Sequence, residues 1–259
     1  MITPFNIYWT ILFVIQFIIP FIVAAKTKVK NREEKLRIVK WFAVFAAIHW
    51  IFYKVSLFLD PDYPNFNIWN ELPLYHCNTI LWLGIIAAIY DIKAIMDYGF
   101  YIGIPCAILA LMMPNLDFVS LPFFSFRAFG FYGTHMCVII LGLLFVTMGL
   151  TEISYKSVLR ATLCFVIMTV AIHLVNIILR STVFPEASYY YTFGFDENFL
   201  LRAFMRFIPI PLLYMTPIFI GSFIVCSLET LIILSLKKLF KNRETSKGQE
   251  YTPEGRLYS

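Results

Sequence analysis

Charged residues are scarce in this chain of 259 residues. Only 14% of the residues are Asp, Glu, Lys or Arg, whereas 60% are hydrophobic and 18% are aromatic. A soluble domain is typically about 25% charged and about 45–50% apolar. The composition therefore excludes a soluble enzyme, a disordered tail protein and a collagen-like chain, and it predicts an integral membrane protein.

Cysteine is also infrequent, and its spacing argues against a metal site. The five cysteines stand at positions 77, 106, 137, 164 and 226, and no two of them form a CxxC pair. Each lies in an apolar segment, so the sequence predicts neither a disulfide framework nor a zinc site. We expect no metal, no nucleotide and no other soluble cofactor.

Long apolar runs follow one another along the chain. Each can cross about 30 Å of hydrocarbon at about 1.5 Å per residue of helix. The pattern predicts an all-α membrane protein, a bundle of seven transmembrane helices within residues 1–240, followed by a polar, disordered cytoplasmic tail at 241–259. The fourth run contains Gly99, Gly103 and Pro105, so a kink or a partly re-entrant path is expected there. The runs cover residues 5–25, 41–59, 72–90, 94–113, 130–150, 157–179 and 212–236.

Lysine and arginine predict the orientation of this bundle. The loops at 26–40, 91–98, 151–160 and 237–259 hold sixteen of the 21 basic residues, and the loops of the opposite side hold four. Basic residues concentrate on the cytoplasmic side of membrane proteins, so the N-terminus is expected outside and the C-terminus inside. We therefore attribute the formal charge of +5 to contact with anionic lipid headgroups rather than with nucleic acid.

The long loops predicted outside, at 114–130 and 180–211, are rich in aromatic residues. They include Tyr189, Tyr190 and Tyr191. The favoured interpretation is a belt of aromatic side chains at the membrane interface. The alternative is a lid over a cavity that opens outward.

Polar residues within the predicted spans gather near the outer face. Cys77 and His135 lie about five residues inside their spans, and His173 and Asn176 lie about six and three residues from the same face. We therefore expect all four roughly 5–10 Å below the outer boundary. A cysteine near a helix N-terminus and a histidine from another span can form a nucleophile and its base. Packing and interhelical hydrogen bonding are the alternative.

Five further polar residues have structural as well as functional interpretations. His49 is expected to donate an interhelical hydrogen bond, and Lys54 to snorkel or to pair with a nearby carboxylate. Glu229 could mark an ion path or bond to a neighbouring helix. Arg127 and Arg180 could bind lipid phosphates or anchor the protein at the interface.

Two short motifs resemble a known family. Residues 72–78, Leu-Pro-Leu-Tyr-His-Cys-Asn, open the third run, and residues 131–135, Phe-Tyr-Gly-Thr-His, begin the fifth, with His135 58 positions after Cys77. They resemble the YwaF-like integral membrane family, which includes the vertebrate transmembrane protein 164, an acyltransferase that moves fatty acyl groups onto ether lysophospholipids. The resemblance implies that Cys77 and His135 are the catalytic pair. The sequence departs from the family at Tyr75, where bacterial members often have histidine, and at 180–182, where an Asn-Tyr pair is typical.

The residues and the resemblance together predict a CoA-independent membrane acyltransferase. Cys77 attacks the ester of a phospholipid donor with His135 as base, and the acyl-thioester then passes to a lysolipid or another lipid-anchored acceptor. A Cys phospholipase, with water as acceptor, and a small-solute transporter or binding protein are the alternatives. The expected location is a bacterial cytoplasmic membrane, with the site toward the outer leaflet. Candidate supporting residues are His76, Asn78, Thr134, His173, Asn176, Arg127 and Arg180.

Overall fold

The computed structural model describes residues 1–61, 63, 66–114, 118, 121–194 and 199–249. Within these residues the chain is helical, and the bridge between Ile2 and Leu121 is its only β-contact. In this described part of the chain, six helices are long and apolar enough to cross a membrane. They are α1 (Ile7–Lys26), α2 (Arg32–Phe58), Lys93–Met112, α6 (Phe126–Thr147), α7 (Tyr155–Thr182) and Leu213–Leu239, which holds the first part of α9 (Thr216–Gln249).

A further apolar helix, α3 (His76–Tyr90), is shorter than these six. Its 15 residues extend about 22 Å, against about 30 Å of hydrocarbon. The predicted start at residue 72 is wrong, because residues 71–75 form turns and bends around Pro73. The all-helical membrane class is confirmed with six candidate spans, and a seventh crossing by α3 stays a prediction.

Polar residues cap the helices at the ends of the bundle. The side chains of Asn6, Ser125 and Ser154 accept hydrogen bonds from the first turns of α1, α6 and α7. Asn31 and Glu34 form a reciprocal capping box at the start of α2. Such caps satisfy amide groups that have no partner within the helix. The capping box explains why α2 begins nine residues before the apolar run predicted at 41–59.

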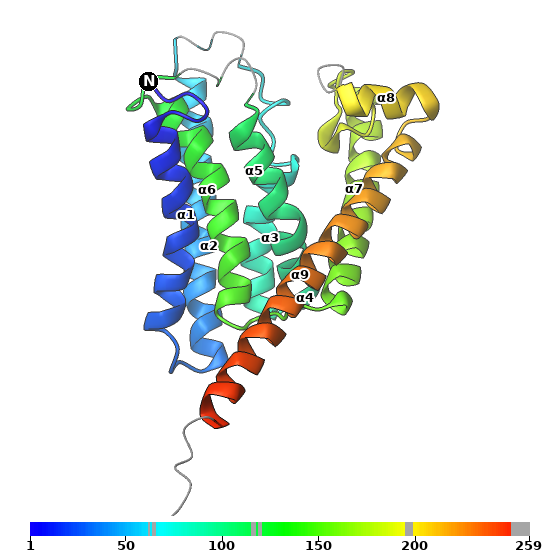
Figure 1. The fold of residues 1–259 in the computed structure, drawn as a ribbon. Coiled ribbons are helices and arrows are strands. Elements are labelled where there is room, and N and C mark those ends of the chain that lie inside the picture. The colour runs from blue at the N-terminus through cyan, green and yellow to red at the C-terminus, as the bar shows by residue number, and fades with distance from the viewer. Residues whose placement is uncertain (62, 64–65, 115–117, 119–120, 195–198, 250–259) are drawn as a thin grey trace, which may run out of the picture.

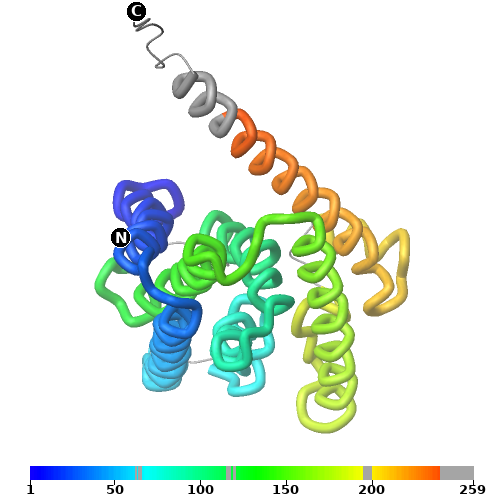
Figure 2. The backbone as a smooth tube through the Cα atoms, turned by 90° about the horizontal axis from the view of Figure 1, so that it is seen from below, coloured from blue at the N-terminus to red at the C-terminus, as the bar shows by residue number. Residues whose placement is uncertain are grey.

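Helix α6 lies at the centre of one half of the molecule. It packs against α1, α2, α3 and α5 (Ile104–Met112), whereas α7 packs against α4 (Lys93–Tyr98) and α9. In Figure 1 the N-terminus and α8 (Phe199–Phe207) lie at one end of the bundle, which we call the outer end, and α9 leads to the opposite end. Figure 2 shows α9 running outward from the bundle toward the C-terminus.

The tail begins inside a helix. Helix α9 continues through Gln249, so it enters the segment 241–259 that the sequence predicts to be disordered. Residues 241–249 are helical in this structure, and residues 250–259 lie outside the described residues. The side chains of α9 change from apolar to polar along the helix, but its backbone hydrogen bonds can continue through that change. The end of the apolar run therefore did not mark the end of α9.

Glycines let α3, α6 and the fourth predicted span approach closely. The irregularity expected in that span is a π-helical turn, η1 (Gly99–Gly103), between α4 and α5. A Cβ atom at Gly142 of α6 would lie 2.7 Å from the carbonyl oxygen of Gly99. A Cβ atom at Gly84 of α3 would lie 2.5 Å from Cδ2 of Leu141. Small residues are the usual means by which helices pack tightly in membranes.

Ion pairs join the helices at the opposite, inner end. The Asp97 side chain on α4 has an exposed fraction of 0%, and its Oδ2 lies 2.5 Å from Nε of Arg160 on α7. The Thr151 hydroxyl donates to the same carboxylate. Asp91 pairs with Arg32, but both side chains are more than a third exposed. Asp97 therefore connects α4 to α7 within the protein, whereas Asp91 pairs near its surface.

Replacing Gly142 by alanine should destabilise the protein by about 1–3 kcal/mol, because the added methyl group meets the backbone of Gly99 and cannot be accommodated by a rotamer change. Gly221→Ala in α9 is the matched control, since nothing lies within 4 Å of its Cβ position. That control should be neutral or stabilise by up to about 1 kcal/mol. Unfolding of both variants in detergent measures the difference. Equal stability of the two would contradict the close approach of η1 and α6.

Asp97→Asn should lower the free energy of unfolding by about 3 kcal/mol or more, because it leaves the Arg160 charge without its buried partner. Asp91→Asn makes the same chemical change in an exposed pair, and should cost no more than about 1 kcal/mol. Thermal unfolding of the two variants side by side checks the order. Similar losses in both would show that the buried connection between α4 and α7 is not formed.

Candidate functional site

Cys77 lies at the outer end of α3. It is the second residue of that helix, which begins at His76 after the turns around Pro73. This is nearer to the helix N-terminus than the predicted span implied. The unpaired amides and the dipole of the first turn favour a negative charge there. The first turn of α3 would therefore favour a thiolate at Cys77 once the thiol has given up its proton.

The register between α3 and α6 follows from two contacts. Gly84 of α3 faces Leu141 of α6, an offset of 57 positions in sequence. The Cβ position of Gly103 touches both Ile80 of α3 and Val138 of α6, an offset of 58. Both helices begin at the outer end, so they run in the same direction. Residues of α3 therefore lie level with residues 57 or 58 positions later in α6.

This register places Cys77 level with Thr134 and His135. Cys77 is two helical turns from Gly84 on the same face, and Thr134 is two turns from Leu141 on the same face. Ile80 and Val138 both lie beside Gly103. Cys77 is three residues, about 4.5 Å, outward of Ile80, and His135 is the same distance outward of Val138. The Cys77 and His135 side chains make no hydrogen bond with each other within the described residues.

His135 has one ring nitrogen occupied and one without a partner. Its Nδ1 lies 2.8 Å from the backbone oxygen of Phe131. A carbonyl oxygen only accepts hydrogen bonds, so Nδ1 of the neutral ring carries the proton and Nε2 carries the lone pair. Nε2 has no hydrogen-bond partner in the described part of the chain. A neutral imidazole of this tautomer can take a proton from a thiol or hydroxyl group.

Thr134 presents a buried hydroxyl group at the same level. Its side chain is buried, and Oγ1 has no hydrogen-bond partner among the described residues. Helical threonines commonly bond to the carbonyl of the preceding turn, as Thr169 does to Phe165. An unpaired buried hydroxyl is costly. Thr134 can therefore donate to a group that enters between α3 and α6.

His76 belongs to a cluster on another face of α3. Its Nδ1 lies 3.1 Å from the Tyr98 hydroxyl, which lies 3.0 Å from the Tyr190 hydroxyl. Tyr190 also bonds to Thr79 at 2.7 Å, and its ring centroid lies 3.4 Å from that of His76. The aromatic belt predicted for this loop is wrong for Tyr189 and Tyr190, because both are buried inside the protein.

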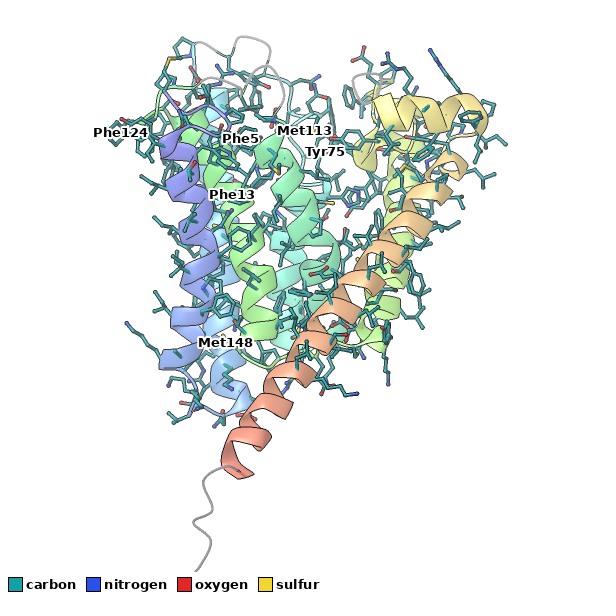
Figure 3. All side chains as sticks on the ribbon, viewed as in Figure 1. Phe5, Phe13, Tyr75, Met113, Phe124 and Met148 are labelled. Carbon is teal, nitrogen blue, oxygen red and sulfur yellow. The ribbon has the colours of Figure 1, made fainter. Side chains whose placement is uncertain are left out.

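His173 and Asn176 hold the loop that carries Tyr190. The Asn176 amide accepts from the backbone N–H of Tyr189 and donates to its carbonyl, at 3.1 and 2.8 Å. Nδ1 of His173 and the Asn176 amide both bond to the Thr192 hydroxyl. These two candidate residues therefore lie with the loop 183–194 and not beside His135. Figure 3 shows Tyr75, whose ring contacts Tyr189 and Tyr191.

The two arginines lie at the outer rim of the protein. Arg127 is the second residue of α6 and lies over the rings of Tyr63 and Phe118. Arg180 lies in the last turn of α7, donates to the carbonyl of Ala187 and lies over the Phe193 ring. Neither touches Cys77 in the described structure.

The remaining candidate polar residues make no described hydrogen bond with Cys77 or His135. Lys54 pairs with Glu71 in a largely buried ion pair, which confirms the pairing alternative. His49 lies against Gly133 and Phe129. Glu229 lines an apolar groove along α9. Asn78 follows Cys77 in α3 and makes no hydrogen bond with another described side chain. Within the described residues, no group of three His, Cys, Asp or Glu side chains could hold a metal ion.

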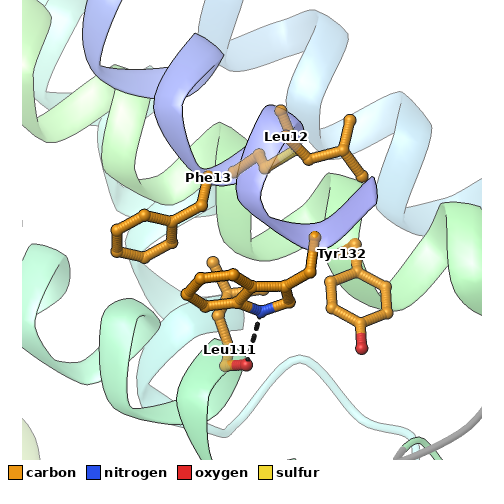
Figure 4. A pocket seen from close by; sticks show the side chains of 6 residues that line it. Leu12, Phe13, Leu111 and Tyr132 are labelled. Atoms are coloured by element: carbon orange, nitrogen blue, oxygen red, sulfur yellow. Dashed lines mark hydrogen bonds between the residues drawn. The ribbon is translucent and has the colours of Figure 1, made fainter. Parts of the chain in front are cut away.

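A small pocket lies on the other side of α6. Trp9, Leu12 and Phe13 of α1 surround it with Leu111, Tyr132 and Met136 (Figure 4). The Trp9 indole donates to the carbonyl of Leu111 at 3.0 Å. The lining residues are mainly hydrophobic, and they do not include Cys77. This pocket therefore offers no nucleophile.

Sequence reasoning missed Tyr98, Tyr190 and Thr79. Tyr190 has a positive φ of 57°, which non-glycine residues seldom adopt. No apolar periodicity marks such a position. The one available signal was the run of three tyrosines at 189–191, and it was assigned to the membrane interface instead.

Comparison with known proteins supports the resemblance to the vertebrate transmembrane protein 164. A sequence model of the TMEM164 family matches residues 1–240, which include Cys77 and His135. No curated protein sequence matches the chain, and no solved structure does. The matched region includes all of α1 to α8 and most of α9. The chain belongs to the TMEM164 family.

Proposed function

We propose that the chain is a CoA-independent membrane acyltransferase that carries the acyl group on Cys77. The observation that carries this proposal is the register of α3 and α6. It sets Cys77 level with Thr134 and His135, one helical turn outward of the contacts at Gly103. A nucleophile, a base with an unprotonated Nε2 and an unpaired hydroxyl donor are the groups that acyl transfer requires. Membership of the TMEM164 family supports the same chemistry.

The first half-reaction transfers the acyl group to the protein. Nε2 of His135 takes the proton of the Cys77 thiol, and the thiolate attacks the ester carbonyl of a phospholipid. The ester C–O bond breaks as the C–S bond forms, and the His135 imidazolium returns the proton to the leaving lysolipid oxygen. The products are a neutral His135, a lysolipid and an acyl-thioester on Cys77.

The second half-reaction uses the same groups. The hydroxyl group of a lysolipid or other lipid-anchored acceptor gives its proton to His135 and attacks the thioester carbonyl. The C–S bond breaks, and the proton on His135 returns to the sulfur of Cys77. The apolar surroundings exclude water, which favours transfer over hydrolysis. With water as acceptor, the same steps would release a fatty acid.

Thr134 is proposed to stabilise the negative oxygen that forms in both steps. Its hydroxyl is buried and has no partner in the described structure, so a developing oxyanion gains a donor that needs no rearrangement. Its position on the face of α6 that meets α3 is the reason to choose it over Asn78.

The proposed membrane leaflet of the lipid substrates depends on which side of the membrane the site faces. We propose that α3 is a seventh crossing, that the N-terminus is outside and that the site opens to the outer leaflet of a bacterial cytoplasmic membrane. The distribution of lysine and arginine supports this orientation. Arg127 and Arg180 at the outer rim would then contact phosphate groups of the donor and acceptor lipids.

Cys77→Ala should abolish acyl transfer, because it removes the sulfur atom on which the proposed thioester forms. The purified protein is incubated with an acyl-radiolabelled phospholipid, and hydroxylamine-labile label on the protein is measured with transfer to added lysolipid. Cys106→Ala is the matched control and should retain both signals. Full transfer by Cys77→Ala would disprove the proposal, and release of fatty acid without transfer would assign a phospholipase instead.

Thr134→Val should slow the formation of the acyl-protein by about 100-fold or more, as removal of one oxyanion donor does in other acyl-transfer enzymes. Valine has nearly the same shape, so packing between α3 and α6 is retained. Thr169→Val on α7 removes a buried hydroxyl with a backbone partner, and should leave this rate unchanged. Single-turnover labelling of Cys77 measures both rates. An unchanged rate in Thr134→Val would remove Thr134 from the mechanism.

A further inference from the structure

A circuit of hydrogen bonds starts at the His76 ring, passes through three other side chains and returns to the His76 backbone. His76 contacts Tyr98, Tyr98 contacts Tyr190, Tyr190 contacts Thr79, and Thr79 donates to the backbone oxygen of His76 at 2.9 Å. Tyr98, Tyr190 and Thr79 are buried, so water does not compete for these bonds. The circuit lies beside Cys77 but includes none of the three residues of the proposed catalytic mechanism.

The number of protons fixes the direction of every bond in this circuit. The Thr79 hydroxyl uses its single proton on the carbonyl, so it accepts from Tyr190. Tyr190 has then used its own proton and accepts from Tyr98. Tyr98 in turn accepts from Nδ1 of His76. Each hydroxyl has one proton to donate, so any other direction leaves two lone pairs facing each other.

The backbone is strained at the loop residues that bring Tyr190 into this circuit. Tyr190 and Tyr191 both have φ of 57°, and such conformations cost of order 1–3 kcal/mol each in residues other than glycine. The Asn176 clamp on the Tyr189 backbone holds the loop in place. Burial raises the pKa of Tyr190, so its hydroxyl remains protonated and able to donate.

The consequence is a specific tautomer of His76. With the proton on Nδ1, the Nε2 atom carries a lone pair and can only accept a hydrogen bond. Nε2 has no partner among the described residues, and His76 is only partly buried. By contrast, Nε2 of His49 is enclosed by the protein. His76 therefore offers an acceptor to a group that enters at the outer end of α3.

We propose that Nε2 of His76 binds the free hydroxyl group of the arriving lysolipid, before that hydroxyl group turns its proton toward His135 and reacts. This proposal rests on the acyltransferase function proposed above, and it deepens it by naming how the acceptor is recognised. A lysolipid has a hydroxyl donor where the diacyl donor lipid has an ester, which has no donor. A ring nitrogen that only accepts can therefore bind the first and not the second. The opposite tautomer would carry a donor at Nε2, which can bond to a hydroxyl or to an ester oxygen and so would not distinguish the two lipids.

The tautomer itself is tested without reference to activity. The chain has four histidines, so 15N-histidine labelling of the purified protein gives few signals, and His76→Phe identifies the signal of His76. We expect the wild type to be protonated at Nδ1 and unprotonated at Nε2. Tyr98→Phe should move the proton to Nε2, whereas Tyr101→Phe, which removes a buried hydroxyl bonded to Thr230, should not. A wild-type ring protonated at Nε2 would overturn the proposal.

Acceptor recognition is tested with His76→Phe, which keeps an aromatic ring against Tyr190 and Phe165. Lysophosphatidylcholine and its analogue without the free hydroxyl are compared as competitors of acyl transfer. The wild type should favour the lysolipid by roughly tenfold, the value of one or two ordinary hydrogen bonds. His76→Phe should bind the two equally and should still form the acyl-protein at Cys77.

The outcomes separate this proposal from the proposed function. If the wild type forms no acyl-protein, the acyltransferase mechanism fails, whereas the tautomer experiment still decides the circuit. If His76→Phe keeps the tenfold preference, acceptor recognition by His76 is overturned and the mechanism stands. If His76→Phe loses acyl-protein formation as severely as transfer, the assignment to the acceptor is also overturned. Unfolding of each variant in detergent confirms that it is folded.

Discussion

The close approach of α3, η1 and α6 is the constraint on which the rest of the structure depends. Gly84, Gly103 and Gly142 stand where a side chain would collide with a neighbouring helix. In a membrane, helices gain little from hydrophobic burial against each other, so van der Waals contact of this kind has to set the register. That register makes Cys77 level with Thr134 and His135, residues that are far apart in sequence.

The second half of the molecule depends on this centre through two polar connections. At the inner end, Asp97 and Arg160 join α4 to α7. The loop after α7 starts at the outer end and brings Tyr190 into the protein, where it bonds to Thr79 of α3 and to Tyr98, the residue after Asp97 in α4. Both connections lie within the protein, where unpaired polar groups are costly, so they fix α7 relative to α3 more specifically than apolar contact does.

Much of this could be predicted from the sequence. The apolar runs predicted the six candidate spans, because a helix that crosses lipid must have apolar side chains. The shared depth of Cys77 and His135 in their runs pointed to these two residues. The start of α3 was misplaced by four residues because Pro73 favours a turn as readily as a helix start. The roles of Tyr189 and Tyr190 could not be predicted, since tyrosine suits a membrane interface and a buried hydrogen bond equally well. The face of α6 that carries Thr134 emerged only once Leu141 was seen against Gly84.

The account depends above all on the register of α3 and α6, and cysteine cross-linking measures it directly. In a chain whose only cysteines are Cys77 and one introduced on α6, mild oxidation reports which positions approach, because a disulfide needs Cα atoms within about 7 Å. Cysteine introduced at Thr134 should link to Cys77 faster than cysteine at Phe131 or Val138. Faster linking at Phe131 or Val138 would place Cys77 one turn away from Thr134 and His135, and would contradict the proposed site.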